Sequence, residues 1–283
     1  MKFGVFGINI GPCADPATAV AVAGAAEAAG FDSVWTGEHV VLPDPQVPPS
    51  PAPPRERFLD PAVSLAFLAG QTERLRLATG IIILPQRNPL VLAKELASVD
   101  VLSGGRLVFG LGAGYLKPEF DALGAPFGDR GSRTDEYLDA MLAVWTQEKP
   151  AFHGSSVHFA GIDAQPRPLQ KPHPPIVVGG NSPPAFRRAV GRGNGWYGFL
   201  RDLPTTERDL SALAQAQREV ERRTALGELE ISVTPMPGTS LDDAQRYRDL
   251  GVHRLVLLPT ARTRDDLLRF VDESAEQLVR KLS

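Results

Sequence analysis

Hydrophobic and polar positions form two kinds of block along this chain. Short apolar blocks of strand type alternate with longer blocks of helix type from one end to the other. The most informative block is Arg74 to Pro85, which begins with alternating residues and then becomes continuously apolar. This pattern is typical of a strand that is buried on both faces of a parallel sheet.

Eight strand–helix pairs are predicted from these blocks. The predicted strands are Lys2 to Asn9, Phe31 to Thr36, Arg74 to Pro85, Arg106 to Gly112, Pro175 to Gly179, Gly195 to Phe199, Leu229 to Val233 and His253 to Leu258. The predicted helices are Asp15 to Gly30, Asp60 to Thr72, Pro89 to Leu102, Ser132 to Thr146, Pro183 to Gly191, Pro204 to Thr224, Leu241 to Leu250 and Thr263 to Leu282. Aspartate before proline is a good helix start, and glycine a good stop.

This repeated alternation predicts the α/β class and a closed (β/α)8 TIM barrel, with residues 1–283 as a single domain. An open doubly wound sheet is the alternative. The first strand is not followed by a Gly-x-Gly-x-x-Gly fingerprint, which counts against a dinucleotide-binding sheet.

Two insertions interrupt the alternation, after strands two and four of the predicted barrel. The range Pro43 to Arg57 contains seven prolines and is expected to form a long loop at the mouth of the barrel, where lids occur. The range Pro150 to Pro174 precedes the fifth strand, and its residues Phe152 to Phe159 are expected to form a small hairpin.

Composition narrows the possible functions. The chain has 283 residues, of which 43% are hydrophobic, and a net charge of −3, so no nucleic-acid or anionic-membrane surface is indicated. The only cysteine is Cys13, which excludes an internal disulfide and a thiolate metal cluster. No stretch of about 18 apolar residues is present, and Met1-Lys2 leads directly into a strand, so a soluble cytoplasmic protein is expected.

Candidate chemistry is found where predicted strands end. Gly80 interrupts the third strand, which indicates either a backbone that a ligand approaches or a simple exit into the turn before Pro89. Glu38 and His39 follow the second strand and form either an acid–base site or a loop in which the histidine bonds a backbone carbonyl.

A candidate anion site follows the fifth strand. Gly179, Gly180, Asn181 and Ser182 precede a helix start at Pro183, where backbone N–H groups and the helix dipole favour a phosphate. Ser182 is alternatively only the N-cap, and both roles are compatible. Arg130 is a candidate clamp for the same anion, or else a surface ion pair. His153 and His158 alone make a poor metal site, so no metal is expected.

With these motifs in order, the chain resembles the bacterial-luciferase-like flavin and deazaflavin oxidoreductases, most closely their coenzyme F-420-dependent branch. The resemblance rests on motifs between residue 1 and about residue 200. They are Gly30 to His39, Leu77 to Pro85, Asn88-Pro89, Leu102 to Leu107, Gly110 to Gly114, Arg130 to Tyr137, Pro174 to Gly180 and Gly195-Trp196.

The resemblance implies a (β/α) barrel with a tricyclic flavin or deazaflavin ring in its mouth. The ring is expected to rest on a bulge at Gly80-Ile81 with a cis peptide bond, backed by Ile81 and Ile82. Glu38 and His39 match positions near the reacting edge of the ring. The remaining implied cofactor contacts are Gly112, Ala113, Gly114, Arg130, Gly179, Gly180, Asn181, Ser182 and Trp196.

Two departures from the family pattern refine this expectation. Where some deazaflavin dehydrogenases carry a glutamate as proton donor, this chain has Ala113, which argues against sugar-phosphate dehydrogenation by that route. Where FMN-binding members often have a tyrosine after the arginine, this chain has Gly131.

Three functional hypotheses follow. The first is a coenzyme F-420-dependent oxidoreductase that transfers a hydride to or from a small organic substrate. The second is an FMN-dependent monooxygenase that receives reduced flavin from a separate reductase. The third is a cofactor-binding protein without turnover. A homodimer is expected from the resemblance.

Overall fold

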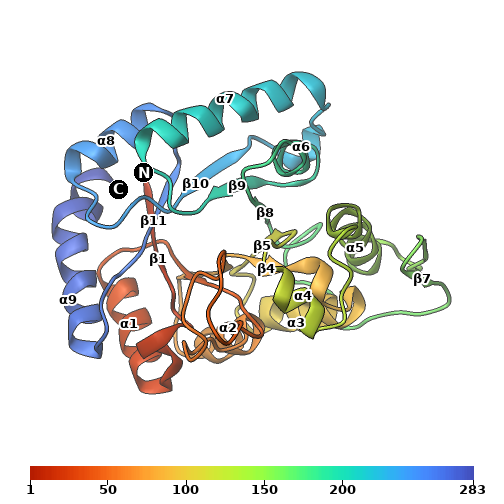
Figure 1. Ribbon diagram of the computed structural model, residues 1–283, viewed down its shortest axis with the longest axis horizontal. Helices are drawn as coiled ribbons and strands as arrows, with labels where there is room; N and C mark the ends of the chain where they lie inside the picture. The colour runs from red at the N-terminus through yellow and green to blue at the C-terminus, as the bar shows by residue number, and fades with distance from the viewer.

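Eight parallel strand positions form a closed barrel in the computed structural model, which describes residues 1–283 (Figure 1). The sheet runs in the order β3, β2, β1, β11, β10, β9, β8, β5, and pairing of β3 with β5 closes it. The predicted barrel is therefore confirmed. The strands are β1 (Lys2–Phe6), β2 (Ser33–Thr36), β3 (Arg76–Thr79), β4 (Ile82–Ile83), β5 (Leu107–Gly112), β8 (Ile176–Gly179), β9 (Gly195–Gly198), β10 (Glu230–Val233) and β11 (Arg254–Leu257).

Helices surround the barrel (Figure 1). Those that follow the barrel strands are α1 (Pro16–Ala28), α2 (Pro61–Ala69), α3 (Pro89–Leu102), α5 (Arg130–Thr146), α6 (Pro183–Arg192), α7 (Leu203–Glu219), α8 (Leu241–Asp249) and α9 (Arg264–Ser274). Most begin at a side-chain cap; the carboxylate of Asp15, for example, accepts from Thr18 N. Such caps satisfy N–H groups that lack a partner within the helix.

Side chains alternate between the inside and the outside of the barrel, as the two-residue period of a strand requires. The interior holds one small cluster of seven buried residues: Phe6, Trp35, Ala78, Val108, Val177, Tyr197 and Val256. Their sequence neighbours, such as Val34, Leu77 and Phe109, face outward into a main core of 55 buried residues beneath the helices. Both faces of the strands are therefore buried.

Several predicted boundaries are corrected. The first strand ends at Phe6 instead of Asn9, and the third is divided into β3 and β4 at Gly80-Ile81. The last helix is interrupted by a π-helical turn, Ala275–Val279, before α10 (Arg280–Leu282). A short helix, α4 (Lys117–Ala122), lies in a segment for which no element was predicted.

The insertions occupy the expected parts of the chain. The hairpin consists of β6 (Phe152–His153) and β7 (His158–Phe159). The proline-rich range from Pro43 to Arg57 contains no helix or strand, and Phe58 next to it pairs with Ile10.

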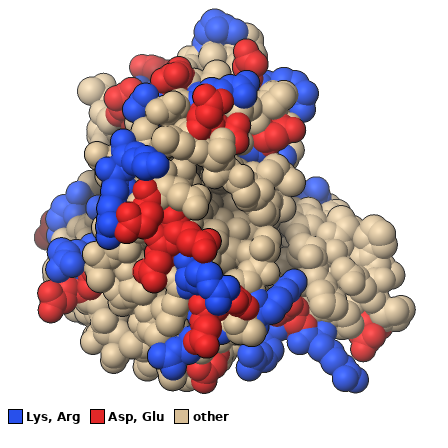
Figure 2. All heavy atoms as spheres, turned by 90° about the vertical axis from the view of Figure 1, so that its left-hand side faces the viewer, with Lys and Arg blue, Asp and Glu red and all other residues tan.

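The chain ends lie side by side, because the ammonium group of Met1 donates to the carbonyl of Leu282 at 2.8 Å (Figure 1). None of the helices is both long enough and apolar enough to span a membrane. On the face that carries α8 and α9, basic and acidic side chains are interspersed (Figure 2).

Candidate active site

A cavity of ≈ 1010 Å³ opens at the carboxyl ends of the strands. This end of a parallel barrel is where ligands bind, because the strand–helix loops converge there. Of the predicted site residues, all but Ile82 and Trp196 line this cavity: Glu38, His39, Gly80, Ile81, Gly112, Ala113, Gly114, Arg130, Gly179, Gly180, Asn181 and Ser182. The loops thus bring together residues that are up to about 140 positions apart in sequence.

The break in the third strand forms one wall of the cavity. The Gly80-Ile81 peptide bond is cis, as expected, and Gly80 N donates to Thr36 O at 2.9 Å. A Cβ at Gly80 would lie 2.9 Å from Thr36 O, so only glycine fits at this position. Ile81 and Ile83 line the cavity.

The expected role of Ile82 behind a cofactor ring is corrected. Ile82 is fully buried in the main core outside the barrel and does not line the cavity. The physical reason is the strand period, because consecutive side chains point to opposite faces, and Ile81 and Ile83 already face the cavity.

The predicted anion site has free donors in the loop itself, whereas the first residues of the helix supply none. Pro183 and Pro184 begin α6 and carry no N–H, and Ser182 Oγ accepts from Ala185 N at 3.4 Å. The N–H groups of Gly180, Asn181 and Ser182 have no acceptor within the protein. These three donors on an exposed loop fit a phosphate group, and the positive end of the α6 dipole supports the same charge.

Two features shape this loop. Gly180 has φ +115, and a Cβ there would lie 3.1 Å from Ala185 Cβ, so the bend requires glycine. Trp196 is fully buried behind the loop, and its Nε1 donates to Gly180 O at 2.8 Å. Trp196 therefore orients the loop and does not line the cavity, which corrects its predicted place among the cofactor contacts.

Arg130 also lines the cavity, at the start of α5, and α6 contacts this start through the hydrogen bond from Arg188 to Gly131 O. Its Nε donates to Gly114 O at 3.1 Å, and its guanidinium stacks 3.9 Å from the centroid of the Phe127 ring. No carboxylate pairs with it, so its charge stays available to an anion.

Both carboxylate oxygens of Glu38 accept hydrogen bonds. Arg87 Nε donates to Oε1 at 2.8 Å, a second Arg87 nitrogen contacts the same oxygen, and Ile83 N donates to Oε2. Burial raises the pKa of Glu38, whereas the Arg87 guanidinium and the Ile83 N–H act to lower it. Only 1% of the Glu38 side chain is exposed. Glu38 therefore suits a positioning residue that connects the loop after β2 to Ile83 in β4.

His39 is held by a carboxylate that the sequence analysis missed. Its Nδ1 lies 3.1 Å from Oε2 of Glu119, whose side chain is fully buried. The other oxygen of Glu119 accepts from Val40 N at 2.6 Å. Nδ1–H donation to the carboxylate leaves Nε2 as the ring nitrogen without a protein partner, in a residue that lines the cavity.

Glu119 lies 80 residues after His39, in α4, where a local signal was available. Lys117-Pro118-Glu119 has proline and an acidic residue in a first helical turn, which is a helix start signal. Nothing in the sequence shows which group the glutamate contacts.

Aromatic side chains complete the cavity. Phe58 and Tyr115 meet the His39 ring edge-on, with centroids 5.5 and 6.1 Å away, and Phe6 and Phe199 lie 4.9 Å apart. Burial, followed by the Glu119 carboxylate, raises the pKa of Tyr115, so this phenol stays neutral near physiological pH. An apolar cavity with a few fixed polar groups is typical of cofactor and small-molecule sites.

Several known proteins are similar to this chain in sequence or in fold. The model of the luciferase-like monooxygenase family matches residues 1–278. An uncharacterised protein of Mycobacterium tuberculosis is 33% identical over 270 residues, covering 92% of this chain and 94% of that protein. The FMNH2-dependent dimethylsulfone monooxygenase of Pseudomonas putida is 38% identical over 138 residues, which cover 48% of this chain and 37% of that enzyme.

Among solved structures, an F-420-dependent secondary alcohol dehydrogenase in complex with an F-420–acetone adduct superposes with a TM-score of 0.80. It shares 16% sequence identity, and the match covers 98% of both chains. At this identity the likeness shows a common fold.

Proposed function

Because the chain belongs to the luciferase-like monooxygenase family, we propose that it is an oxidoreductase that uses coenzyme F-420 to exchange a hydride with a small organic substrate. The observation that carries the proposal is the arrangement of the barrel cavity. Free N–H donors of Gly180 and Asn181 lie on one wall, and the His39 ring lies on another.

Different parts of the cavity would bind different parts of such a cofactor. The loop from Gly180 to Ser182, together with Arg130, would hold its phosphate. The bulge at Gly80-Ile81 would carry the ring system, with Gly112 to Gly114 lining the adjacent wall. Coenzyme F-420 supplies a ring carbon that donates or accepts a hydride.

Proton movement is assigned to His39. A hydride transfer to or from a carbonyl or alcohol requires a proton at the substrate oxygen, and Nε2 of His39 is the ring nitrogen free to hold it. Glu119 fixes the orientation of the ring through its contact with Nδ1, so it acts as a positioning residue. The aromatic side chains of Phe58 and Tyr115 keep water away from this ring.

FMN is the second candidate cofactor, and the 38% identity to an FMNH2-dependent monooxygenase favours it. In that case the protein would receive reduced flavin from a separate reductase. Gly131, in place of the tyrosine found in many FMN-binding members, favours coenzyme F-420. A cofactor-binding role without turnover is the third candidate, which the organised His39–Glu119 pair disfavours.

The deciding experiment is a titration of the purified apoprotein with coenzyme F-420, FMN and riboflavin, followed by fluorescence. We expect coenzyme F-420 to bind most tightly, and riboflavin to bind far more weakly than FMN because it lacks the phosphate. Tighter binding of FMN than of coenzyme F-420 would favour the monooxygenase. Failure of all three to bind would refute the proposed function.

Two variants locate the phosphate in the same experiment. Gly180→Leu fills the bend of the loop and should weaken binding by at least about tenfold. Gly238→Leu is the matched control, because Gly238 has φ +86 but lies outside the cavity. Equal affinities in the two folded variants would mean that the loop is only a helix cap.

A further inference from the structure

Part of the lining of the barrel cavity is almost entirely apolar. We call this part the apolar wall, and it consists of Phe6, Ile10, Phe58, Tyr115 and Phe199. The only polar side-chain atom among these residues is the hydroxyl oxygen of Tyr115. Tyr115 is 49% exposed and Phe199 is 39% exposed, so two aromatic rings of the wall are open to a ligand.

Contacts between these side chains make the apolar wall continuous. The rings of Phe6 and Phe199 have their centroids 4.9 Å apart. A Cβ at Gly37 would lie 2.8 Å from Ile10 Cδ1 and 3.2 Å from Phe6 Cζ. The same point is 3.7 Å from Phe58 Cε1, so the side chains of Ile10, Phe6 and Phe58 converge beside Gly37.

The apolar wall adjoins both places at which the proposed reaction would occur. Phe58 and Tyr115 meet the His39 ring edge-on, with centroids 5.5 and 6.1 Å away. A Cβ at Gly80 would lie 3.4 Å from Phe6 Cε2, so Phe6 is next to the bulge that would carry the cofactor ring. A molecule that lies on this wall is therefore near the bulge and near His39.

The charged side chains that line the cavity have partners of opposite charge, with one exception. Glu38 accepts from Arg87 Nε at 2.8 Å, and Arg188 Nε donates to Asp135 at 2.8 Å. The exception is Arg130, which contacts a carbonyl oxygen and an aromatic ring and is assigned above to the cofactor phosphate.

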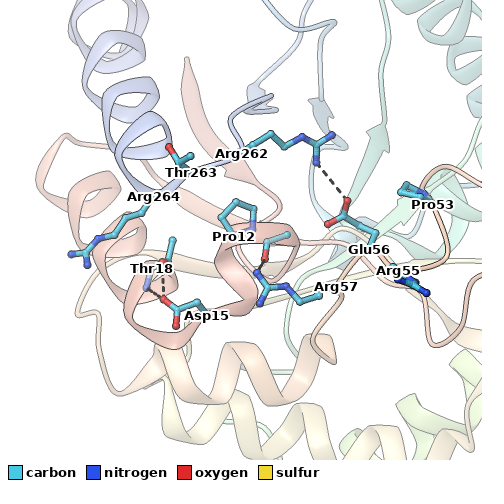
Figure 3. Close-up of a pocket in the computed structure, with 11 residues that line it drawn as sticks. Pro12, Asp15, Thr18, Pro53, Arg55, Glu56, Arg57, Arg262, Thr263 and Arg264 are labelled. Atoms are coloured by element: carbon cyan, nitrogen blue, oxygen red, sulfur yellow. Dashed lines mark hydrogen bonds and ion pairs between the residues drawn. The ribbon is translucent and has the colours of Figure 1, made fainter.

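Two further ion pairs complete the charged lining. Arg201 lies 3.0 Å from Asp209. Arg262 lies 3.5 Å from Glu56, at a neighbouring pocket of ≈ 580 Å³ that both residues also line (Figure 3). No unpaired charge is thus left for a charged substrate, and burial of such a charge on the apolar wall would cost free energy that nothing there offsets.

We propose that the substrate is a neutral carbonyl compound or alcohol with an apolar, ring-bearing body that packs on the apolar wall and places its oxygen at Nε2 of His39. This inference rests on the proposed function and names the substrate class of the same site. In the reducing direction the carbonyl carbon gains the hydride and the oxygen gains the proton from His39, so a ketone becomes an alcohol while the reduced cofactor is oxidised.

The test uses the full-length protein saturated with the cofactor that it binds, and measures by calorimetry its affinity for acetone, acetophenone and 4-acetylbenzoate. Acetophenone has a ring that acetone lacks, and 4-acetylbenzoate adds one carboxylate to that ring. We expect acetophenone to bind at least about tenfold more tightly than either, because burial of the ring is favourable and burial of the unpaired charge is not. Equal or tighter binding of acetone or 4-acetylbenzoate would overturn the inference, and so would failure of acetophenone to bind.

A charge placed on the wall should reverse the preference. Phe199→Arg introduces a cation at a partly exposed position, so the ratio of the affinities for acetophenone and 4-acetylbenzoate should shift by at least about tenfold toward the acid. Both affinities are measured in one protein, so the ratio does not depend on the fraction of protein that is folded. Leu169→Arg is the matched control, because Leu169 is 54% exposed and lies outside the cavity, and it should leave the ratio unchanged.

A second variant tests the wall without adding a charge. Tyr115→Ala removes an exposed ring and should weaken acetophenone binding by about fivefold while the affinity for acetone changes little. An unchanged ratio in Phe199→Arg, or an unchanged acetophenone affinity in Tyr115→Ala, would refute the placement of the substrate on this wall.

Cofactor binding separates this inference from the proposed function. If the cofactor binds and 4-acetylbenzoate is preferred, the proposed function stands and the substrate class is wrong. If neither coenzyme F-420 nor FMN binds, the proposed function fails, and the substrate inference that rests on it falls too.

Discussion

At the scale of single residues, the Ile81 side chain explains why two positions in the cavity wall are glycine. A Cβ at Gly112 would lie 2.2 Å from Ile81 Cδ1, and one at Gly179 would lie 3.0 Å from Ile81 Cγ2. Both glycines therefore make room for Ile81 where it faces the cavity. Gly110 has a different reason, because a Cβ there would lie 1.9 Å from the carbonyl oxygen of Thr79.

The packing of Ile81 predicts a compensating pair of substitutions. Gly112→Ala should destabilise the protein by about 1–3 kcal/mol, because the new methyl group overpacks against Ile81 Cδ1. Ile81→Val removes that carbon, so the double variant should recover at least about 1 kcal/mol relative to the sum of the single changes. Chemical denaturation of the four proteins measures this coupling.

Gly110→Ala is the matched comparison, because its clash is with backbone and Ile81→Val should not relieve it. Additive effects of Gly112→Ala and Ile81→Val would contradict the packing described here.

Sequence signals predicted the backbone that forms the cavity wall, but not which side chains contact one another inside the cavity. Gly80 stood out because glycine is unusual inside a buried strand, and the loop at Gly180 stood out because it joins a strand to a helix start. The pairing of His39 with Glu119 could not be predicted, since it depends on how two loops fold over the barrel. The assignment of Ile82 to the cavity was wrong because the bulge hid which alternate residues face inward.

At the scale of elements, helix starts were easier to predict than strand ends. α3 begins at Pro89, directly after Asn88, whose side chain accepts from Leu90 N and Val91 N. Cap and helix are neighbours in sequence, so the signal is local. Strand ends depend on partners far away in sequence, and the first predicted strand was accordingly too long by three residues, ending at Asn9 instead of Phe6.

At the opposite end of the barrel from the cavity, an ion-pair network joins three strands. Arg254 on β11 donates to Asp32 at 2.8 Å and contacts Glu230 on β10, while Lys2 on β1 lies 2.7 Å from Glu230. Only 3% of the Arg254 side chain is exposed. Burial alone would raise the pKa of Glu230, but Arg254 and Lys2 together lower it.

A lowered pKa in the folded state means that the ionised form of Glu230 stabilises the fold above its unfolded pKa. We expect Glu230→Gln to cost about 2 kcal/mol at pH 7, because it leaves the buried Arg254 short of a carboxylate. The difference from the parent should shrink as the pH falls from the unfolded pKa through the lowered folded-state pKa of Glu230, where the parent also loses this charge. Urea denaturation at pH 7, 5 and 3.5 measures it.

The control is Glu276→Gln, which removes an exposed i,i+4 pair with Arg280 and should cost less than about 0.5 kcal/mol at any of these pH values. A pH-independent loss in Glu230→Gln would mean that the glutamate acts through packing and not through its charge.

At the scale of the whole molecule, the expected homodimer has a candidate face. Adjacent helices α2 and α3 expose large apolar side chains, with Val63 68%, Phe67 45% and Val91 56% exposed. Apolar patches of this kind are typical of protein interfaces. We expect light scattering after size exclusion to give twice the chain mass of 30.5 kDa, and Phe67→Glu to give the monomer.

Leu250→Glu is the matched control, because it changes an exposed apolar residue outside these two helices and should leave the mass unchanged. A parent protein of 30.5 kDa would contradict the dimer, and a dimer that survives Phe67→Glu would move the interface elsewhere.

Because β1 pairs with β11, the barrel can close only after both strands have been synthesised. β1 begins at Lys2 and is synthesised well before its partner β11, which begins at Arg254. At typical translation rates the edge of β1 waits roughly 10 to 50 s for that partner. Until then the apolar side chains of Phe3 and Val5 and one row of backbone groups lack their final cover. A nascent chain stalled before Arg254 should therefore be a preferred client of chaperones, and one in which β11 has left the ribosome and paired with β1 should not.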